Sequence, residues 1–326
     1  MHPRGAAAAA FSTFDAMPLH PVFASALQAA RLAGRPGLSS GSVAQARALV
    51  DGSTGVLGPG EAVESVSEQL VATRGGSVAA RLYRPFGGPR ALLVYFHGGG
   101  WVAGALASFD ALARTLASRS QSSVLLVDYR LAPEHPFPAA VDDAEDAVRW
   151  AAARLPELAA AGVPLMVGGD SAGANLATVT AAALRDALPI ALQLLFYPVA
   201  DTDLDTDSYR RHGTGYLLAA EDMRWFLSHY APQDRWHDGR IAPLRAAQLP
   251  RAPAWIGLAE YDVLLTEGEA YAQRLAAAGV PVTCRRYDGL THGFARWFNL
   301  VDSASHALDD AAAAIAAACA THPTKD

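Results

Sequence analysis

The sequence contains 326 residues, of which 51% are hydrophobic and 18% are charged, and its formal net charge is −6. A chain of this size and composition can bury a substantial core, so it needs no disulfide bond or metal ion to fold. Acidic and basic residues are interspersed along the chain, which excludes the concentrated basic patch of a surface that binds nucleic acid or anionic membranes.

The first eleven residues contain one arginine followed by a run of five alanines. This apolar stretch is too short for the core of a signal peptide, and no later segment is long and apolar enough to span a bilayer. We therefore expect a cytoplasmic protein. The two cysteines, Cys284 and Cys319, are expected to be buried free thiols, which is consistent with the cytosol.

The first elements expected along the chain are helices over residues 18–50, interrupted at Gly34 and Gly37, and a strand hairpin over 65–73 and 77–83. Further on, short apolar runs alternate with helix-length segments. The apolar runs span 91–96, 123–128, 165–168, 192–197, 254–258 and 280–287, and the helical segments include 106–118, 139–153 and 172–185. This alternation indicates an α/β fold with a mostly parallel sheet covered by helices on both faces.

Residues 198–253 interrupt the alternation, because no strand is predicted there. An insertion of this length in a compact fold is more often functional than idle. We expect residues 201–249 to form a helical cap over the carboxyl edge of the sheet, joined by the N-terminal helices of residues 1–55. The catalytic domain would comprise residues 56–200 and 250–326. The insertion carries several large apolar side chains: Tyr216, Leu217, Leu218, Trp225 and Phe226.

A glycine-rich loop, Gly98–Gly100, follows the first strand of the alternation and is flanked by His97 and Trp101. Ester hydrolysis develops negative charge on the carbonyl oxygen, and backbone N–H groups aimed at that position stabilise it. Glycines permit the loop conformation that this requires. The alternatives are an ordinary turn or a phosphate-binding loop, but the sequence of the loop matches neither common phosphate motif.

The segment from Gly169 to Gly173 reads Gly-Asp-Ser-Ala-Gly and lies between a predicted strand and a predicted helix. This strand–turn–helix context is that of a nucleophile elbow, which exposes a serine hydroxyl at the edge of a sheet. Ser171 is therefore the candidate nucleophile, and the alternative is that it only caps the helix. The glycine loop and this motif each follow their own strand, and their combination is more specific than either one.

The other members of a Ser–acid–His set are expected in that order along the chain. Asp262 follows the strand predicted at 254–258 and precedes a helix, with Glu260 nearby as the second choice. His292 is the one histidine of ten that lies between the last predicted strand and the closing helix. A neutral imidazole there could take the serine proton while the carboxylate orients it.

The chain resembles the bacterial hormone-sensitive-lipase-like esterases, over about residues 91 to 294. The matching stretches are His97–Trp101, Asp128–Ala140, Gly169–Gly173, Asp262–Leu264 with Glu267–Gly268, and His292–Phe294. The resemblance implies an α/β-hydrolase fold with a helical cap, no cofactor, and hydrolysis of short- to medium-chain acyl esters. It also implies that Gly99, Gly100 and Ala172 donate to the oxyanion. We further expect Trp101 and Phe294 to contact the substrate.

This sequence departs from the family pattern at Ala174, where a third glycine is common, and at Thr266, where an aspartate often precedes Glu267. No metal site is expected, because His229 and His237 do not form a convincing ligand set. The segment 201–207, with four aspartates, lacks the glycine and glutamate positions of a calcium-binding EF-hand loop, so it is interpreted as a solvated loop.

Several alternatives stay open at this stage. An amidase, a lactonase or a carbamate hydrolase would use the same three residues, since only the pocket and the leaving group differ. A ligand receptor on the same fold is also conceivable, but related plant receptors lack the histidine that His292 supplies here. The expected partner is a small-molecule ester, and the sequence leaves open whether the chain forms a homodimer.

Overall fold

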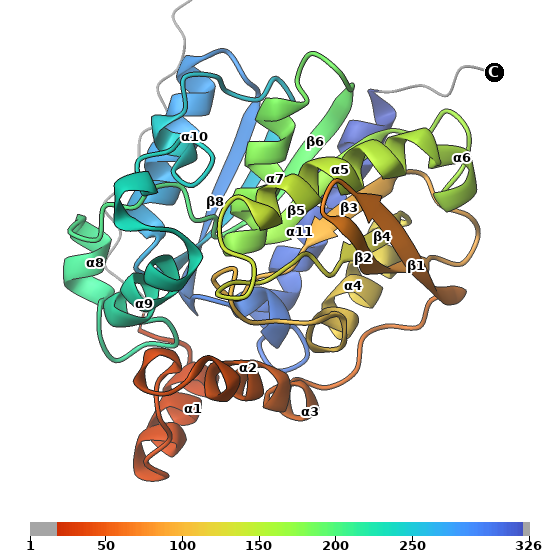
Figure 1. Cartoon of the computed structure of the whole chain (residues 1–326). Helices are drawn as coiled ribbons and strands as arrows, with labels where there is room; N and C mark the ends of the chain where they lie inside the picture. The colour runs from red at the N-terminus through yellow and green to blue at the C-terminus, as the bar shows by residue number, and fades with distance from the viewer. Residues whose placement is uncertain (1–17, 322–326) are drawn as a thin grey trace, which may run out of the picture.

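Eight strands form one sheet in the computed structural model, which describes residues 18–321 (Figure 1). The strands are β1 (Ser65–Thr73), β2 (Gly76–Arg84), β3 (Leu92–Phe96), β4 (Ser123–Val127), β5 (Leu165–Asp170), β6 (Ile190–Phe196), β7 (Ala254–Tyr261) and β8 (Val282–Thr291). Their order across the sheet is β1-β2-β4-β3-β5-β6-β7-β8. Only β2 pairs antiparallel, with β1 and β4, and the remaining pairs are parallel. The predicted mixed, mostly parallel sheet is confirmed.

The central strands β3, β4, β5 and β6 are buried at every residue, as expected for parallel strands covered on both faces. The edge strand β8 is different, because most of its first half is exposed. The expectation of a buried thiol at Cys284 is therefore wrong: this residue lies on the edge strand and is exposed, while Cys319 is partly buried. Both cysteines are free thiols.

The last strand is longer than the sequence predicted, since β8 runs to residue 291 rather than 287. Asp288 and Gly289 have the composition of a turn, and Gly289 has a positive φ of 74°. The carboxylate of Glu260 accepts a hydrogen bond from the Gly289 amide (2.7 Å), and the pairing with β7 resumes at Tyr261. His292 consequently follows the strand directly.

The helices of the described chain are α1 (Pro21–Leu32), α2 (Val43–Gly52), α3 (Thr54–Leu57), α4 (Leu106–Ser120), α5 (Ala139–Ala153), α6 (Leu155–Leu158), α7 (Ala172–Ala183), α8 (Asp207–His212), α9 (Ala220–Tyr230), α10 (Leu265–Ala277) and α11 (Asp302–Ala320). Short 3₁₀ turns are η1 (Leu38–Ser40), η2 (Gln233–Arg235), η3 (Pro243–Arg245) and η4 (Phe294–Trp297). A capping box between Ser42 and Gln45 starts α2.

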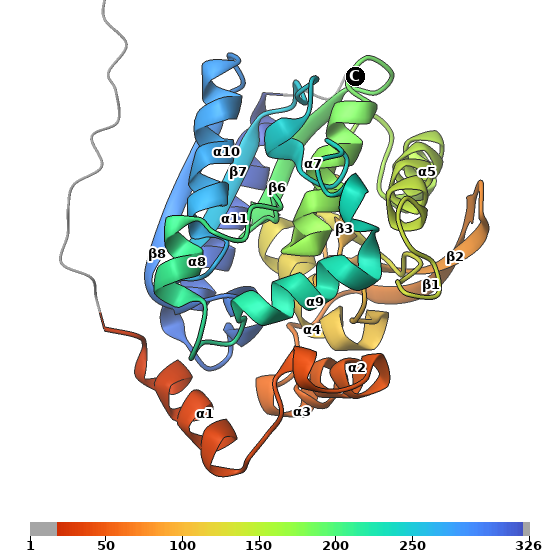
Figure 2. The same cartoon turned by 60° about the vertical axis from the view of Figure 1, so that its left-hand side comes forward.

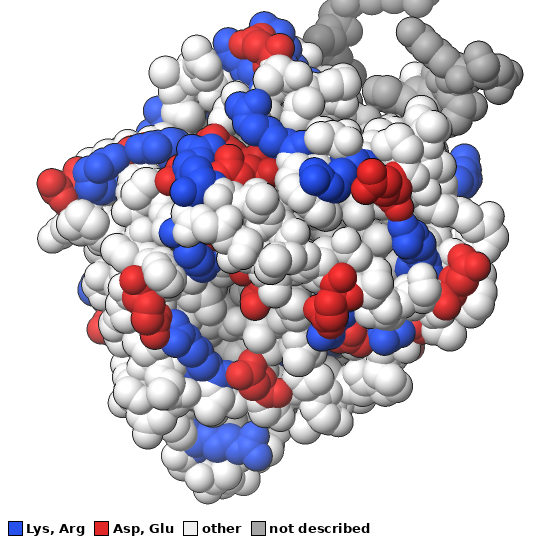
Figure 3. Space-filling model, turned by 45° about the vertical axis from the view of Figure 1, so that its right-hand side comes forward, with Lys and Arg blue, Asp and Glu red and all other residues white. Residues whose placement is uncertain are grey.

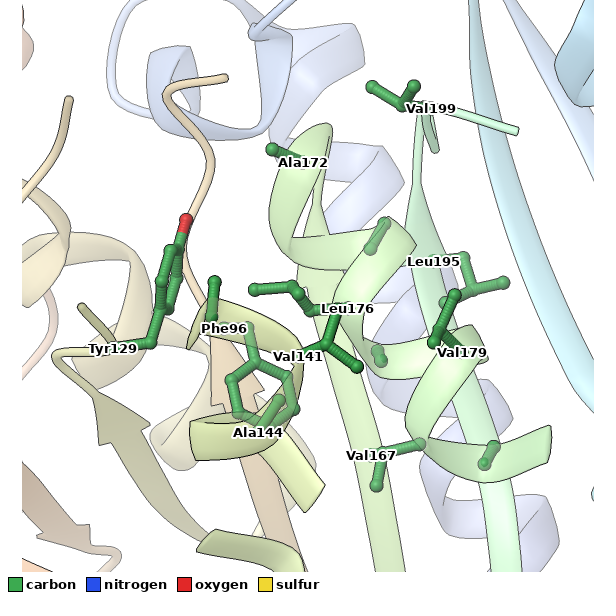
Figure 4. Packing of buried hydrophobic residues seen from close by; sticks show 14 of the residues in the cluster. Phe96, Tyr129, Val141, Ala144, Val167, Ala172, Leu176, Val179, Leu195 and Val199 are labelled. Carbon is green, nitrogen blue, oxygen red and sulfur yellow. The ribbon is translucent and has the colours of Figure 1, made fainter. Parts of the chain in front are cut away.

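The helices bury two apolar clusters, one on each face of the sheet. Residues of α5, α7 and α10 form the first cluster, and residues of α4 and α11 form the second. Figure 4 shows the first cluster around α7, where Leu176 lies beside Val141 of α5 and Val179 lies farther along the same helix. This packing holds the amino end of α7 in place at the carboxyl edge of the sheet.

The N-terminal helices α1–α3 lie together at one end of the molecule, next to α9 (Figures 1 and 2). The contact is specific, because the Asp222 carboxylate of α9 accepts hydrogen bonds from the Ser39 amide of η1 and from the Ala219 amide (both 2.9 Å). The start of the predicted N-terminal segment, residues 1–17, lies outside the described residues.

The surface carries both signs of charge. On the face shown in Figure 3, arginine side chains lie beside aspartate and glutamate side chains rather than in one large basic patch. Within residues 18–321, no helix combines the length and the hydropathy that a membrane crossing requires.

Candidate active site

Ser171 lies in the sharp turn between β5 and α7, with a positive φ of 56° that is unusual for a residue other than glycine. Glycine is required on both sides of it. A Cβ atom on Gly173 would lie 1.9 Å from the Phe96 carbonyl oxygen, and one on Gly169 would lie 2.3 Å from the Gly173 carbonyl carbon. The Ser171 amide donates to the Phe196 carbonyl of β6 (2.9 Å). Sheet packing thus holds the turn in its strained conformation.

His292 connects the serine to the predicted acid, because each ring nitrogen has one of them as its partner. Its Nε2 lies 2.9 Å from the Ser171 Oγ, and its Nδ1 lies 2.7 Å from Oδ2 of Asp262. A carboxylate can only accept, so the Nδ1–H donates to Asp262 and Nε2 is left to accept from the serine hydroxyl. The three residues follow β5, β7 and β8, whose carboxyl ends lie at the same edge of the sheet.

The carboxylates near this edge have different partners. The second oxygen of Asp262 accepts from the Leu264 amide (3.0 Å), which fixes the carboxylate, and the side chain is buried. Glu260, the second choice in the sequence, accepts instead from Gly289. The ring of Tyr197 packs against the His292 ring at a centroid distance of 4.7 Å and supports the imidazole from one side.

The glycine loop beside Ser171 has positive φ angles at three successive residues: Gly99 (118°), Gly100 (60°) and Trp101 (60°). The loop leaves no room for larger residues, because a Cβ atom on Gly99 would lie 2.1 Å from the Ala103 carbonyl oxygen. Gly99 and Gly100 line one cavity with Ser171. Ala172 is the first residue of α7, where a backbone N–H has no acceptor within the helix.

Two buried ionisable side chains, those of Asp170 and His97, form hydrogen bonds with the backbone of the glycine loop. The Asp170 carboxylate accepts from the Gly98 amide (3.0 Å) and from the Tyr95 hydroxyl (3.1 Å). Burial raises the pKa of Asp170 to about 6, although these hydrogen bonds oppose the shift. Burial also lowers the pKa of His97 to about 4, so its imidazole is neutral at pH 7, and its Nδ1 donates to the Gly98 carbonyl (2.8 Å).

A cavity of about 780 Å³ adjoins Ser171 and His292. One wall comes from the N-terminal segment, including Leu27, Arg31, Ser39, Val50 and Leu57, and the opposite wall includes Tyr216, Leu217, Leu218, Met223 and Phe226. Four of the five apolar residues singled out in the insertion thus line the cavity, and Trp225 does not. Arg296 also lines it, and its position four residues after His292 is the only sequence signal that could have indicated it.

Neither of the two expected substrate contacts lies on the cavity wall. Trp101 is fully buried and stacks on Tyr230 at a centroid distance of 4.3 Å. Phe294 is fully buried between Tyr197 and Phe196. The residues next to the glycine loop and to His292 therefore serve as packing beneath the site, because the backbone turns their side chains into the core.

The aspartate-rich segment is not the fully solvated loop that was expected. Asp201 is buried and pairs with Arg245 (2.5 Å between Oδ1 and Nε). Thr266 hydrogen-bonds to Ser208, so the position where relatives often carry aspartate ties α10 to α8. In the part of the chain that the structure describes, no group of three His, Cys, Asp or Glu side chains could hold a metal ion.

The chain is similar to known proteins in both sequence and structure. Residues 93–296 match the model of a family described as alpha/beta hydrolase fold. The carboxylic ester hydrolase LipN of Mycobacterium tuberculosis is 44% identical over 69% of this chain and 63% of its own length. The ethyl acetate hydrolase of Pseudomonas putida is 39% identical over 80% of this chain and 86% of its own. Among solved structures, a hyperthermophilic esterase from the archaeon Pyrobaculum calidifontis has a TM-score of 0.86 at 37% identity, covering 92% of this chain and 99% of that one.

Proposed function

Since this chain belongs to the alpha/beta hydrolase fold family, in its hormone-sensitive-lipase-like branch, and is a carboxylic ester hydrolase, we propose that it cleaves short- to medium-chain acyl esters. In this proposal Ser171 is the nucleophile, His292 is the base and Asp262 is the acid that orients the base. One observation carries the proposal: the His292 ring contacts the Ser171 hydroxyl with one nitrogen and the Asp262 carboxylate with the other. That arrangement selects the tautomer that can accept the serine proton.

The reaction then takes two steps. The Ser171 Oγ adds to the ester carbonyl carbon while its proton passes to Nε2 of His292, and the carbonyl oxygen becomes an oxyanion that accepts from the amides of Gly99, Gly100 and Ala172. The oxyanion collapses, and His292 returns the proton to the leaving alcohol. A water molecule repeats the sequence on the acyl-enzyme and releases the acid. Asp262 stabilises the imidazolium that forms in each step.

We propose that the N-terminal segment up to residue 55 and residues 201–249 act together as the cap of this site. The two walls of the cavity support this assignment, because one comes from each segment. Closing the acyl side limits chain length and excludes water from the oxyanion. The cytoplasmic location stays a prediction from the sequence, and whether the chain forms a homodimer stays open.

The test is the Ser171→Ala variant assayed with p-nitrophenyl butyrate, beside the matching anilide as an amide probe. The variant should fold as the wild type does and lose essentially all ester hydrolysis, since it has no nucleophile. In the wild type, rapid quenching and mass spectrometry should find the butyryl group on the peptide that contains Ser171. An active, folded Ser171→Ala variant would assign the nucleophile elsewhere.

A further inference from the structure

Two N–H groups of the glycine loop, those of Gly99 and Gly100, are oriented by hydrogen bonds to the carbonyl group in the same peptide unit. The peptide bonds of this loop are trans, so each C=O points opposite to the N–H of the same unit. The Gly98 carbonyl accepts from His97, which orients the Gly99 N–H. The Gly99 carbonyl accepts from the amides of Val102 (3.1 Å) and Ala103 (2.9 Å), which orients the Gly100 N–H.

Arg47 reaches this loop from α2, far away in the sequence. Its Nε donates to the Val102 carbonyl (2.8 Å), and its Nη2 donates to the Ala132 carbonyl (3.1 Å). The Ala132 amide in turn donates to the Trp101 carbonyl (2.9 Å). The same guanidinium forms a two-pronged ion pair with Glu134 (2.6 and 2.8 Å). Arg47 thus contacts the residue that follows the strained turn directly, at Val102, and is connected to Trp101 through Ala132.

These contacts form one continuous chain. The Arg47 guanidinium donates to the Val102 carbonyl, which belongs to the same peptide unit as the Ala103 N–H. The Ala103 N–H donates to the Gly99 carbonyl, which belongs to the same peptide unit as the Gly100 N–H. The free end of the chain is the Gly100 N–H. A charged donor makes a stronger hydrogen bond, and successive bonds in a chain polarise one another.

We propose that Arg47 is a positioning residue for the oxyanion hole, aligning and polarising the Gly100 amide through these two peptide units. The inference rests on the proposed function, which assigns that amide to the oxyanion. It gives the N-terminal segment a part in the chemistry as well as in covering the site. The ion pair with Glu134 has a smaller part, because the two side chains are 31% and 55% exposed and such pairs contribute little.

The oxyanion is present in the tetrahedral intermediate and in the transition states beside it but not in the bound ester, so the loss should fall on turnover rather than on substrate binding. In Arg47→Met we expect kcat for p-nitrophenyl butyrate to fall at least about tenfold, less than the ~10²–10³ that removal of an oxyanion donor costs. KM should change by less than about twofold. A trifluoromethyl ketone, which Ser171 converts to a tetrahedral oxyanion adduct while His292 takes the proton, should bind more weakly by the same factor. The corresponding trifluoromethyl carbinol, which forms no adduct, should bind as before.

Two further variants separate positioning from simple support of the helix. Arg47→Lys keeps one charged donor, so its kcat should lie between those of Arg47→Met and the wild type. If Arg47→Met does not fold, the same measurements are made on Arg47→Lys instead. Glu134→Gln removes the ion pair but leaves both carbonyl contacts, so its kcat should stay near wild type. If the folded Arg47 variants turn over normally, or bind the ketone as tightly as the wild type does, the inference is wrong.

The Ser171→Ala variant, assayed in parallel, distinguishes the two levels of failure. An active Ser171→Ala enzyme would overturn the proposed function itself. An inactive Ser171→Ala enzyme beside fully active Arg47 variants would overturn only the role of Arg47.

Discussion

At the scale of single residues, the site depends on which of two neighbouring carboxylates faces the imidazole. Asp262 and Glu260 are two positions apart at the end of β7 and are both buried. The shorter side chain lies beyond the strand and reaches Nδ1 of His292, whereas Glu260 is occupied by the Gly289 amide. The two therefore have separable effects on activity.

Asp262→Asn should lower kcat by about 10⁴, because an amide at this position favours the tautomer whose Nε2 cannot accept the serine proton. Steady-state hydrolysis of p-nitrophenyl butyrate measures the loss. Glu260→Gln is the matched control, since its amide oxygen can still accept from Gly289, and its kcat should stay within about threefold of wild type. A larger loss in the Glu260 variant than in the Asp262 variant would transfer the role of the acid.

His97 makes stability depend on pH with a defined sign. Burial lowers its pKa to about 4 in the folded chain, against 6.5 for an exposed imidazole, so the unfolded state takes up a proton first as the pH falls. Its contribution to the free energy of unfolding is present at pH 7, is lost as the pH falls from about 6.5 to 4, and then levels off. The pKa of Asp170 is raised, so its contribution to stability changes with pH in the opposite direction. The pH dependence of the wild type therefore does not isolate the contribution of His97.

Comparing the wild type with His97→Asn removes the Asp170 contribution, because both proteins contain that residue. The difference in the free energy of unfolding between the two should change by ~3 kcal/mol in favour of the variant between pH 7 and pH 4. Urea unfolding at several pH values measures it. A difference that is constant with pH would mean that His97 titrates normally in the folded chain.

At the scale of elements, helices α2 and α9 both contact residues in or next to the site. Through Arg47, helix α2 contacts the Val102 carbonyl just beyond the glycine loop. The Val50 carbonyl in its last turn and the Ser53 hydroxyl after the helix accept hydrogen bonds from Arg296. Helix α9 approaches from the other side, and a Cβ atom on Gly100 would lie 2.2 Å from the Phe226 ring. The ring thus closes the cavity beside the glycine loop.

Phe226→Ala should widen the cavity next to Gly100. The ratio of kcat/KM for p-nitrophenyl 2-ethylbutyrate to that for the butyrate should rise by roughly tenfold, because two added carbons can then be buried at about 0.8 kcal/mol each. The variant should also be less stable by about 3–5 kcal/mol, since Phe226 is buried. Trp225→Ala on the same helix is the control, as Trp225 does not line the cavity. An unchanged ratio in Phe226→Ala would remove this ring from the acyl site.

At the scale of the whole molecule, the cavity between the N-terminal segment and the insertion has the size of a small-molecule site. We expect kcat/KM to peak at roughly four to eight acyl carbons, since each methylene adds about 0.8 kcal/mol only while it still fits. A series of p-nitrophenyl esters from acetate to palmitate measures the profile. Hydrolysis of emulsified triolein as fast as that of butyrate esters would contradict this view of the cap.

The sequence by itself determined the fold class and the order of the strands along the chain, because both depend on local patterns. Continuous apolar runs such as that of β3 mark buried parallel strands, and the glycines around Ser171 mark a turn that only they permit. It also indicated Asp262 and His292, since each follows a strand and the carboxyl ends of parallel strands share one edge. These inferences need only neighbours along the chain.

The tertiary structure decided what depends on distant neighbours. Trp101 and Phe294 stand beside site residues in the sequence, yet the direction of the backbone buries both side chains in the core. Cys284 lies in an apolar strand pattern, but its strand is the uncovered edge of the sheet. The hydrogen bond from Arg47 to Val102 spans 55 positions and leaves no local pattern. Such contacts follow from how the helices pack, which no spacing of residues along the chain records.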